Sequence, residues 1–145
     1  MRDVVPILRK LHNLETMAVE IYRVQIPRLT DPEERKLMVA AMDNEMLHRE
    51  TFRSLLVKHS ATLSPLRYAW WFVGQVLGLS TALLGRGMLF RGDMAFEEKA
   101  VREYSEIAAM EGFDAEEAGF LDRFLEDEKR HVAHWKFCLG HPHKQ

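Results

Sequence analysis

The chain has 145 residues, of which 47% are hydrophobic and 29% are charged. This composition favours one folded domain and excludes a disordered or collagen-like chain. Twenty Lys and Arg residues are balanced by 22 Asp and Glu residues, so the net charge of −2 gives no electrostatic basis for binding nucleic acid. The single cysteine, Cys138, excludes an internal disulfide and any four-cysteine zinc or iron site.

The first two predicted elements are long helices. One extends from about residue 4 to residue 26. The other begins after Asp31, whose carboxylate can cap the helix while Glu34 closes a capping box, and it continues to about residue 58. Only a few residues connect these helices, which predicts an antiparallel hairpin over residues 4–58.

A second pair of helices is predicted in the last third of the chain. The third helix is expected to begin after Gly92 and Asp93 and to end at Gly112. The fourth begins at Asp114, the start of another capping pattern, and runs to about residue 139. The short link between them again predicts a hairpin, over residues 93–139.

The two hairpins are joined by a long connection, residues 59–92. Four long helices with one long crossover between the second and third are typical of the ferritin-like four-helix bundle. The expected fold class is therefore all-α, with residues 1–145 forming a single domain.

The crossover contains an apolar stretch that bears on membrane contact. Residues 68–85 are 18 residues without a charge, which is the lower limit for spanning a bilayer. Spanning would place the two hairpins on opposite sides of the membrane, so an interfacial segment over residues 68–90 is favoured, with Tyr68, Trp71 and their aromatic neighbours at the lipid surface. The alternatives are packing on the bundle and a homo-oligomer interface.

The beginning of the chain lacks the long apolar region of a signal peptide. Together with the apolar crossover, this predicts a cytoplasmic protein that lies peripherally on the inner face of the cell membrane.

Each predicted helix carries an apolar stripe that a glutamate interrupts, and two of the stripes also contain a histidine. The stripe residues recur every three or four positions, so each set lies on one helix face. Isolated buried carboxylates are costly, whereas two divalent cations would neutralise four of them. The pattern therefore predicts a dinuclear metal site. Its predicted ligands are Glu15, Glu45, His48, Glu97, Glu128 and His131.

The same spacing occurs in both halves of the chain. In each half a glutamate precedes a Glu-x-x-His pair, by 30 residues in the first half and by 31 in the second. Two hairpins related by an approximate twofold axis would bring the six ligands together. A tyrosine, Tyr22 or Tyr104, follows the first glutamate of each half by seven residues. Each tyrosine either hydrogen-bonds a metal-bound carboxylate or packs in the core.

Other polar residues are weaker candidates. Glu20 and Glu50 lie off the stripes. His12 lies one turn before Glu15, and His134 lies one turn after His131. A surface or interface position is favoured for both histidines, with a supporting role beside the metal as the alternative.

Oxygen and imidazole ligands suit two iron ions, or manganese, and leave coordination positions open for oxygen or peroxide. No Gly-x-Gly-x-x-Gly pattern follows a predicted strand, so reducing equivalents are expected from an external electron donor. One interpretation of this predicted site is that it catalyses an oxygen-dependent hydroxylation. The others are a rubrerythrin-like or catalase-like reaction with peroxide, oxidation of iron, and a metal-free helical adaptor at the membrane.

Five segments of the chain resemble the demethoxyubiquinone hydroxylase family. They are LHNLETMAVEIYRVQ, MDNEMLHRETF, PLRYAWWFVGQVLGLSTALLG, MAFEEKAVREY and EDEKRHVAHW. The resemblance implies a di-iron site with the six ligands above and with Glu45 and Glu128 as bridging carboxylates. It also implies an oxygen-dependent monooxygenase that hydroxylates an apolar, membrane-borne quinone. The chain departs from the usual family pattern at Asn13, Leu14 and Glu103.

Overall fold

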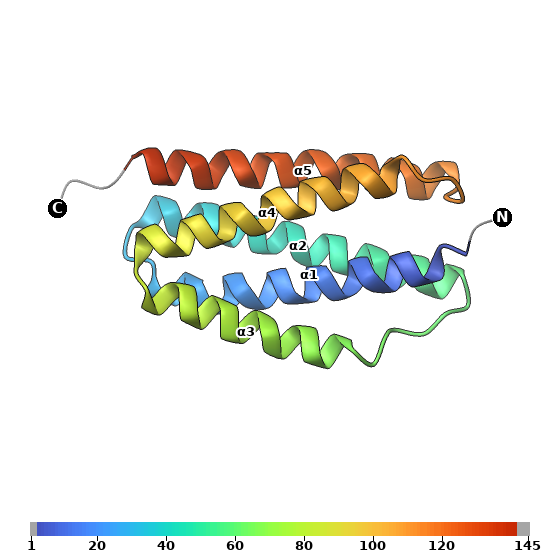
Figure 1. Cartoon of the computed structure of the whole chain (residues 1–145), viewed down its shortest axis with the longest axis horizontal. Coiled ribbons are helices and arrows are strands. Elements are labelled where there is room, and N and C mark those ends of the chain that lie inside the picture. The colour runs from blue at the N-terminus through green and yellow to red at the C-terminus, as the bar shows by residue number, and fades with distance from the viewer. Residues whose placement is uncertain (1–2, 142–145) are drawn as a thin grey trace. The chain divides into compact units, whose positions relative to one another are not determined.

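The computed structural model describes residues 3–141, whose regular elements are all helices, with no strand among them. The chain divides into two compact units, Met1–Leu83 and Leu84–Gln145 (Figure 1). The all-α prediction is confirmed. Residues 1–2 and 142–145 of the predicted single domain lie outside the described residues. The helices are α1 (Val5–Gln25), the 3-10 helix η1 (Ile26–Arg28), α2 (Pro32–Lys58), α3 (Arg67–Leu83), α4 (Arg86–Ala108) and α5 (Ala115–Gly140).

The predicted helix starts at Asp31 and Asp114 are confirmed. The Asp31 carboxylate accepts a hydrogen bond from the Glu34 backbone N–H at 2.9 Å, and Pro32 occupies the first position of α2. Asp114 accepts from the Glu117 N–H at 3.0 Å, and the Glu117 carboxylate accepts from the Asp114 N–H at 3.0 Å. These bonds satisfy backbone donors that have no partner within the helix, which is why both helices begin where they do.

The predicted start of the third long helix is wrong. Helix α4 begins at Arg86, so Gly92 and Asp93 lie inside it, and it ends at Ala108 rather than at Gly112. The break falls at Gly85, whose φ of 96° is disfavoured for residues with a side chain. Arg86 also fixes the helix start, because its guanidinium donates a hydrogen bond to the Cys138 carbonyl at 2.6 Å.

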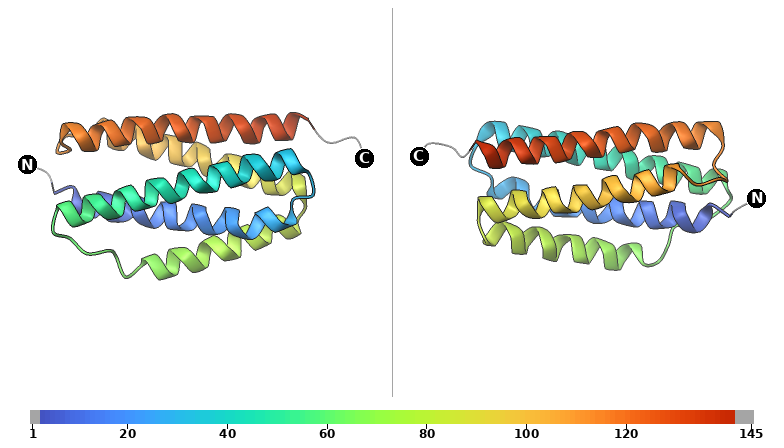
Figure 2. Two further views of the ribbon diagram at one scale, coloured as in Figure 1. Left: turned by 180° about the vertical axis from the view of Figure 1, so that it is seen from behind. Right: turned by 45° about the horizontal axis from the view of Figure 1, so that its top comes forward.

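The crossover contains a helix, α3, that packs along α1. In the first unit α1 is the middle helix, with α2 on one side and α3 on the other (Figures 1 and 2). Close contact is made where α3 has glycine. A Cβ on Gly74 would lie 2.5 Å from the Met17 carbonyl oxygen, and one on Gly78 would lie 2.7 Å from that of Ile21. Packing on neighbouring helices, one of the alternatives to the favoured interfacial segment, is therefore observed for one face of α3.

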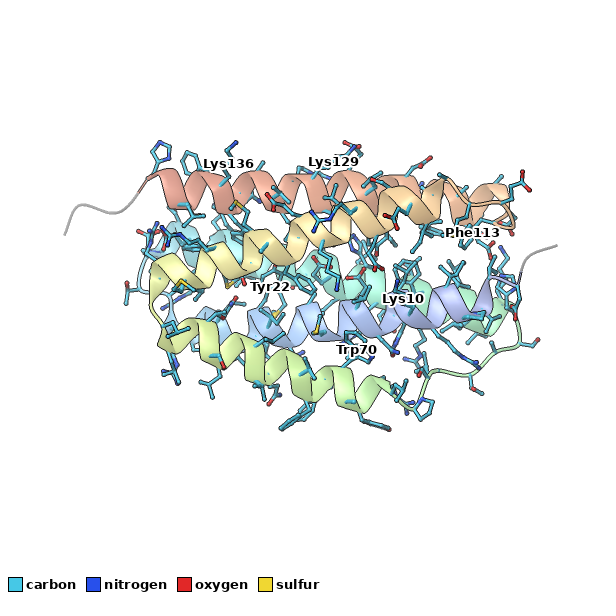
Figure 3. The ribbon with its side chains drawn as sticks, viewed as in Figure 1. Lys10, Tyr22, Trp70, Phe113, Lys129 and Lys136 are labelled. Carbon is cyan, nitrogen blue, oxygen red and sulfur yellow. The ribbon has the colours of Figure 1, made fainter. Side chains whose placement is uncertain are left out.

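Polar side chains reinforce the contact between α1 and α3. Gln75 donates to the Glu20 carboxylate at 3.1 Å, and Gln25 donates to the Thr81 hydroxyl at 2.9 Å. Trp70, labelled on α3 in Figure 3, is half-buried, and its position four residues before Gly74 places it on the same helix face. The helix is thus held by close backbone contact and one side-chain hydrogen bond along its middle, and by a second hydrogen bond toward its end.

The opposite face of α3 is apolar and exposed. Side chains such as Phe72, with 60% of its surface exposed, would be costly to leave in water over so large an area. No helix in residues 3–141 combines the length and the apolar character needed to cross a membrane. The exposed face consists of Tyr68, Trp71, Phe72, Val73, Val76, Leu77, Leu79 and Leu83.

The second unit is a hairpin of α4 and α5 joined by residues 109–114. Its core includes Phe90 and Trp135, whose rings stack with centroids 5.7 Å apart. Cys138 is also buried, as expected for a small apolar side chain. This packing orients the inner faces of the hairpin on which the second set of predicted ligands lies.

Candidate metal centre

Helices α1 and α2 bring the first three predicted ligands together. The Nδ1 atom of His48 lies 3.4 Å from Oε2 of Glu45 and 3.9 Å from Oε1 of Glu15. Glu45 and His48 are three residues apart on α2, so both side chains project from the same side of the helix. All three side chains are buried, with at most 5% of their surface exposed. One donor atom from each lies within 4.8 Å of the others.

The second unit repeats this arrangement with residues of α4 and α5. The Nδ1 atom of His131 lies 3.5 Å from Oε1 of Glu97 and 3.6 Å from Oε2 of Glu128. At most 3% of each side chain is exposed, and one donor atom from each again lies within 4.8 Å of the others. Each unit therefore contains a buried group of two carboxylates and one imidazole.

The donor chemistry of each group suits a divalent cation. Two buried carboxylates next to each other repel, and one imidazole can neutralise at most one of them. Carboxylate oxygens with an imidazole nitrogen are ligands that iron and manganese accept, and they lack the thiolates that favour structural zinc. The residues present thus fit the predicted metal. The structure brings them together as two groups of three.

Tyr22 and Tyr104 occupy the predicted positions beside these groups. Tyr22 lies two turns after Glu15 on α1 (Figure 3), and Tyr104 lies two turns after Glu97 on α4. Their exposed fractions are 1% and 2%. Both rings belong to the buried core, and hydrogen bonding to a metal ligand stays a prediction.

The apolar stripes that predicted these ligands are buried in the structure. The apolar residues of these stripes are buried on α2 (Met38, Ala41, Phe52 and Leu55) and on α5 (Leu121, Phe124, Trp135 and Cys138). On α4 the corresponding residues Met94 and Val101 are half-exposed. Two carboxylates outside the predicted ligands and caps are buried unexpectedly, Glu20 and Asp93, of which Asp93 lies inside α4 and is 2% exposed. Glu20 is only 4% exposed, because α3 covers the side of α1 on which it lies. The apolar residues Met17, Ala18, Val19 and Ile21 around Glu20 were the available signal, since a helix that is apolar on more than one side is covered on more than one side.

The surface position favoured for His12 is wrong. Its side chain is 5% exposed and lies near residues of α2 and α3. Burial, and next the positive charge of Arg49, lower the pKa of His12 to about 4. The imidazole is therefore neutral at physiological pH. His134 is half-buried, and burial followed by the charge of His131 also lowers its pKa.

The lowered pKa of His12 predicts a pH-dependent stability. Folding shifts this pKa from 6.5 to about 4, so between these values the unfolded chain binds the proton more readily than the folded chain. We expect the free energy of unfolding to fall as the pH is lowered from 6.5 towards 4, and to fall less steeply in the His12→Asn variant. Urea unfolding of both proteins between pH 7 and pH 4.5 measures the difference. Parallel curves would contradict the prediction.

The chain is helical, and in each of its two units a glutamate and a Glu-x-x-His pair form a buried group. These features define the class of ferritin-like carboxylate proteins. Within that class, residues 2–136 match the model of the family described as ubiquinone biosynthesis protein COQ7. The chain belongs to this family, the demethoxyubiquinone hydroxylases, which are enzymes of ubiquinone biosynthesis. The resemblance found in the sequence is therefore confirmed. No individual curated protein matches the chain.

Proposed function

We propose that the protein is a di-iron monooxygenase that hydroxylates a membrane-borne quinone intermediate with oxygen. The observation that carries the proposal is the repeated buried group of two carboxylates and one histidine in a chain of the COQ7 family. We further propose that the two groups join into one dinuclear centre within a single domain. The matched spacing supports this, because each half of the chain supplies the same ligand set.

Charge balance supports two metal ions rather than one. The two groups together contain four carboxylates, with a formal charge of −4, and two divalent cations supply +4. A single cation would leave two buried negative charges uncompensated, which is unfavourable in a medium of low dielectric constant. In this proposal the four glutamates Glu15, Glu45, Glu97 and Glu128 would hold the two metals together with His48 and His131, and the family resemblance implies bridging roles for Glu45 and Glu128. Iron is favoured by the family, and manganese would accept the same donors.

The bound irons would supply the chemistry that activates oxygen for insertion into the quinone ring. The protein residues would fix the metals, keep water out and hold the ring in place. The buried rings of Tyr22 and Tyr104 would exclude water on either side, and their hydroxyl groups would orient ligand carboxylates. The electrons would come from an external donor.

An apolar quinone must reach the site from a membrane, and α3 offers a surface for that approach. We propose that the exposed apolar face of α3, within residues 68–90, lies in the interfacial region of the inner face of the cell membrane. The aromatic residues Tyr68, Trp71 and Phe72 support this, because such rings favour the boundary between lipid and water. Homo-oligomerisation through the same face is the competing outcome, and sedimentation with and without vesicles separates the two.

The proposal is tested first by metal content. We expect about two irons per chain after anaerobic loading with Fe(II), and a change in visible absorption when oxygen is added. The loaded protein, with a chemical reductant, should then hydroxylate a short-chain demethoxyquinone. A folded protein that binds no iron under these conditions would contradict the proposed metal centre. Rapid peroxide breakdown without quinone hydroxylation would favour the catalase-like reaction instead.

A further inference from the structure

A small cavity lies in the first unit, where the connection before α3 meets α1 and α2. Its volume is about 210 Å³, and it is open to solvent on one side. His12 and Thr16 of α1 form one wall, and Arg49 and Arg53 of α2 form another. Arg67 and the aromatic residues at the start of α3 complete the lining. None of these residues is a predicted metal ligand.

The cavity has an excess of positive charge. Three arginines line it, whereas Glu50 is the one acidic side chain in the lining. Glu50 is shared by two of the arginines, since its carboxylate oxygens lie 3.7 Å from Arg49 Nε and 3.4 Å from Arg53 Nη1. One carboxylate cannot neutralise three guanidinium groups, so the lining attracts an anion.

Arg67 is held in position at the edge of the cavity. Its guanidinium donates to the Ser64 carbonyl at 3.0 Å and to the Tyr68 hydroxyl at 2.7 Å. A guanidinium has five N–H donors, so these two bonds leave others for a ligand. Planar guanidinium groups of this kind match the oxygens of a phosphate in pairs.

His12 provides a second, independent sign of a ligand. Its Nδ1 atom is buried and has no hydrogen-bond partner among residues 3–141. Buried polar atoms nearly always have a partner, and leaving one without costs free energy. An anionic oxygen in the cavity would accept a hydrogen bond from this nitrogen when it carries the proton.

The surroundings indicate where such an anion would come from. Tyr68 and Trp71 line the cavity and also belong to the exposed apolar face of α3, with 66% and 43% of their surfaces exposed. A neighbouring cavity of about 390 Å³ shares Arg53 and Arg67, and its lining includes apolar residues of α2 such as Leu56. An anion bound here would thus lie between basic groups and apolar surface. This combination suits the phosphate of a phospholipid better than a free ion.

We propose that this cavity binds a phosphate group, supplied by an anionic phospholipid. The lipid source rests on the membrane contact proposed above, whereas the phosphate site does not depend on the metal centre. The bound headgroup would fix the start of α3 at the membrane surface and so set the orientation of the apolar face.

Vesicle flotation with the full-length, iron-loaded protein tests the proposal. Vesicles of a neutral, phosphate-free glycolipid receive either phosphatidylglycerol or a fatty acid, adjusted to the same surface potential. We expect tighter binding to the phosphatidylglycerol vesicles. The Arg53→Gln/Arg67→Gln variant should bind them about 10- to 30-fold more weakly, in line with the loss of two basic residues near an anionic surface. Its binding to the undoped glycolipid vesicles should be unchanged.

Two further variants separate a site from a diffuse charge effect. Arg102→Gln/Arg130→Gln removes the same charge from the second unit and should change binding by less than about twofold, because neither arginine lines the cavity and a charge outside a binding site is screened by salt. Arg53→Lys/Arg67→Lys retains the charge but not the paired donors, and should still bind phosphatidylglycerol several-fold more weakly than the original protein. Thermal unfolding and iron content are measured for every variant. A retained iron content separates failure of this site from failure of the metal centre.

The binding measurements either support the phosphate site or contradict it. Selective loss of phosphatidylglycerol binding in the Arg53/Arg67 variants supports it. Equal loss in the second-unit variant, or equal binding to the fatty-acid vesicles, would overturn it in favour of general electrostatic attraction. Calorimetric titration with inorganic phosphate identifies the source. The original protein could bind free phosphate, and the Arg53→Gln/Arg67→Gln variant could lose that binding, while neither prefers phosphatidylglycerol vesicles. This result would support the phosphate site and contradict a phospholipid as the source of the phosphate.

Discussion

Replacing Glu128 with alanine is expected to abolish quinone hydroxylation and to lower the iron content. Glu128 is 1% exposed, and its Oε2 atom lies 3.6 Å from His131 Nδ1, so the change removes one donor of a compact group of three. Loss of residues that merely support metal ligands costs about 10- to 100-fold in affinity or activity, so loss of a ligand should cost at least about 100-fold. Iron analysis and a quinone hydroxylation assay measure both effects.

The matched control is Glu126→Ala, two residues earlier on α5. The Glu126 side chain is 65% exposed and pairs with Lys129 at 2.6 Å, and exposed pairs of this kind contribute little. This variant should retain its iron and its activity. Iron binding should also raise the melting temperature of the Glu126→Ala control. It should raise the melting temperature of Glu128→Ala much less, because iron stabilises the folded protein only to the extent that the folded protein binds it. Full activity in Glu128→Ala would contradict the proposed mechanism.

Substituting alanine at Gly74 or Gly78 is expected to release α3 from α1. The new Cβ would lie 2.5 Å or 2.7 Å from a backbone carbonyl oxygen of α1, closer than van der Waals contact allows. Backbone atoms cannot rotate away as a side chain can, so the helices must separate. We expect each change to lower the free energy of unfolding by about 1–3 kcal/mol, the usual cost of overpacking, even though alanine favours helices. Urea unfolding measures the loss.

Gly87→Ala is the control for this prediction. Gly87 lies in α4, and no atom would come within 4 Å of its added Cβ. Alanine there should leave stability unchanged or raise it by about 0.4–1 kcal/mol, since it restricts the unfolded chain. The Gly74 and Gly78 variants should also lose binding to neutral vesicles, because the apolar face would no longer be presented on an ordered helix. Equal stability of all three variants would show that α3 does not need this close contact.

Much of the candidate site could be predicted from local pattern. A Glu-x-x-His pair on a helix brings its two side chains to one side whatever surrounds it, so Glu45–His48 and Glu128–His131 follow from helical periodicity alone. The partner glutamates, Glu15 and Glu97, follow once each short connection is recognised as the turn of a hairpin. The capping residues Asp31 and Asp114 could be predicted for the same reason, because a cap involves only residues within one turn of it.

Other features depended on contacts between distant parts of the chain. The start of α4 was misplaced because Gly85 and Gly92 are equivalent in a local pattern, and the hydrogen bond from Arg86 to Cys138, 52 residues away, is not part of that pattern. The surface or interface position predicted for His12 was wrong, and Glu20 was placed off the buried stripes, because both are covered where α3 and the connection before it fold back over α1.

The sequence by itself therefore determined the helical class, the presence of four long helices and the two sets of buried carboxylate and histidine residues, because these depend on interactions within a few residues or on a repeated spacing. The tertiary structure decided that the apolar crossover contains a helix, which of its faces is covered and which polar residues it buries. Those features arise from close packing between segments more than 50 residues apart, such as Glu20 with Gln75, and periodicity carries no information about such pairings.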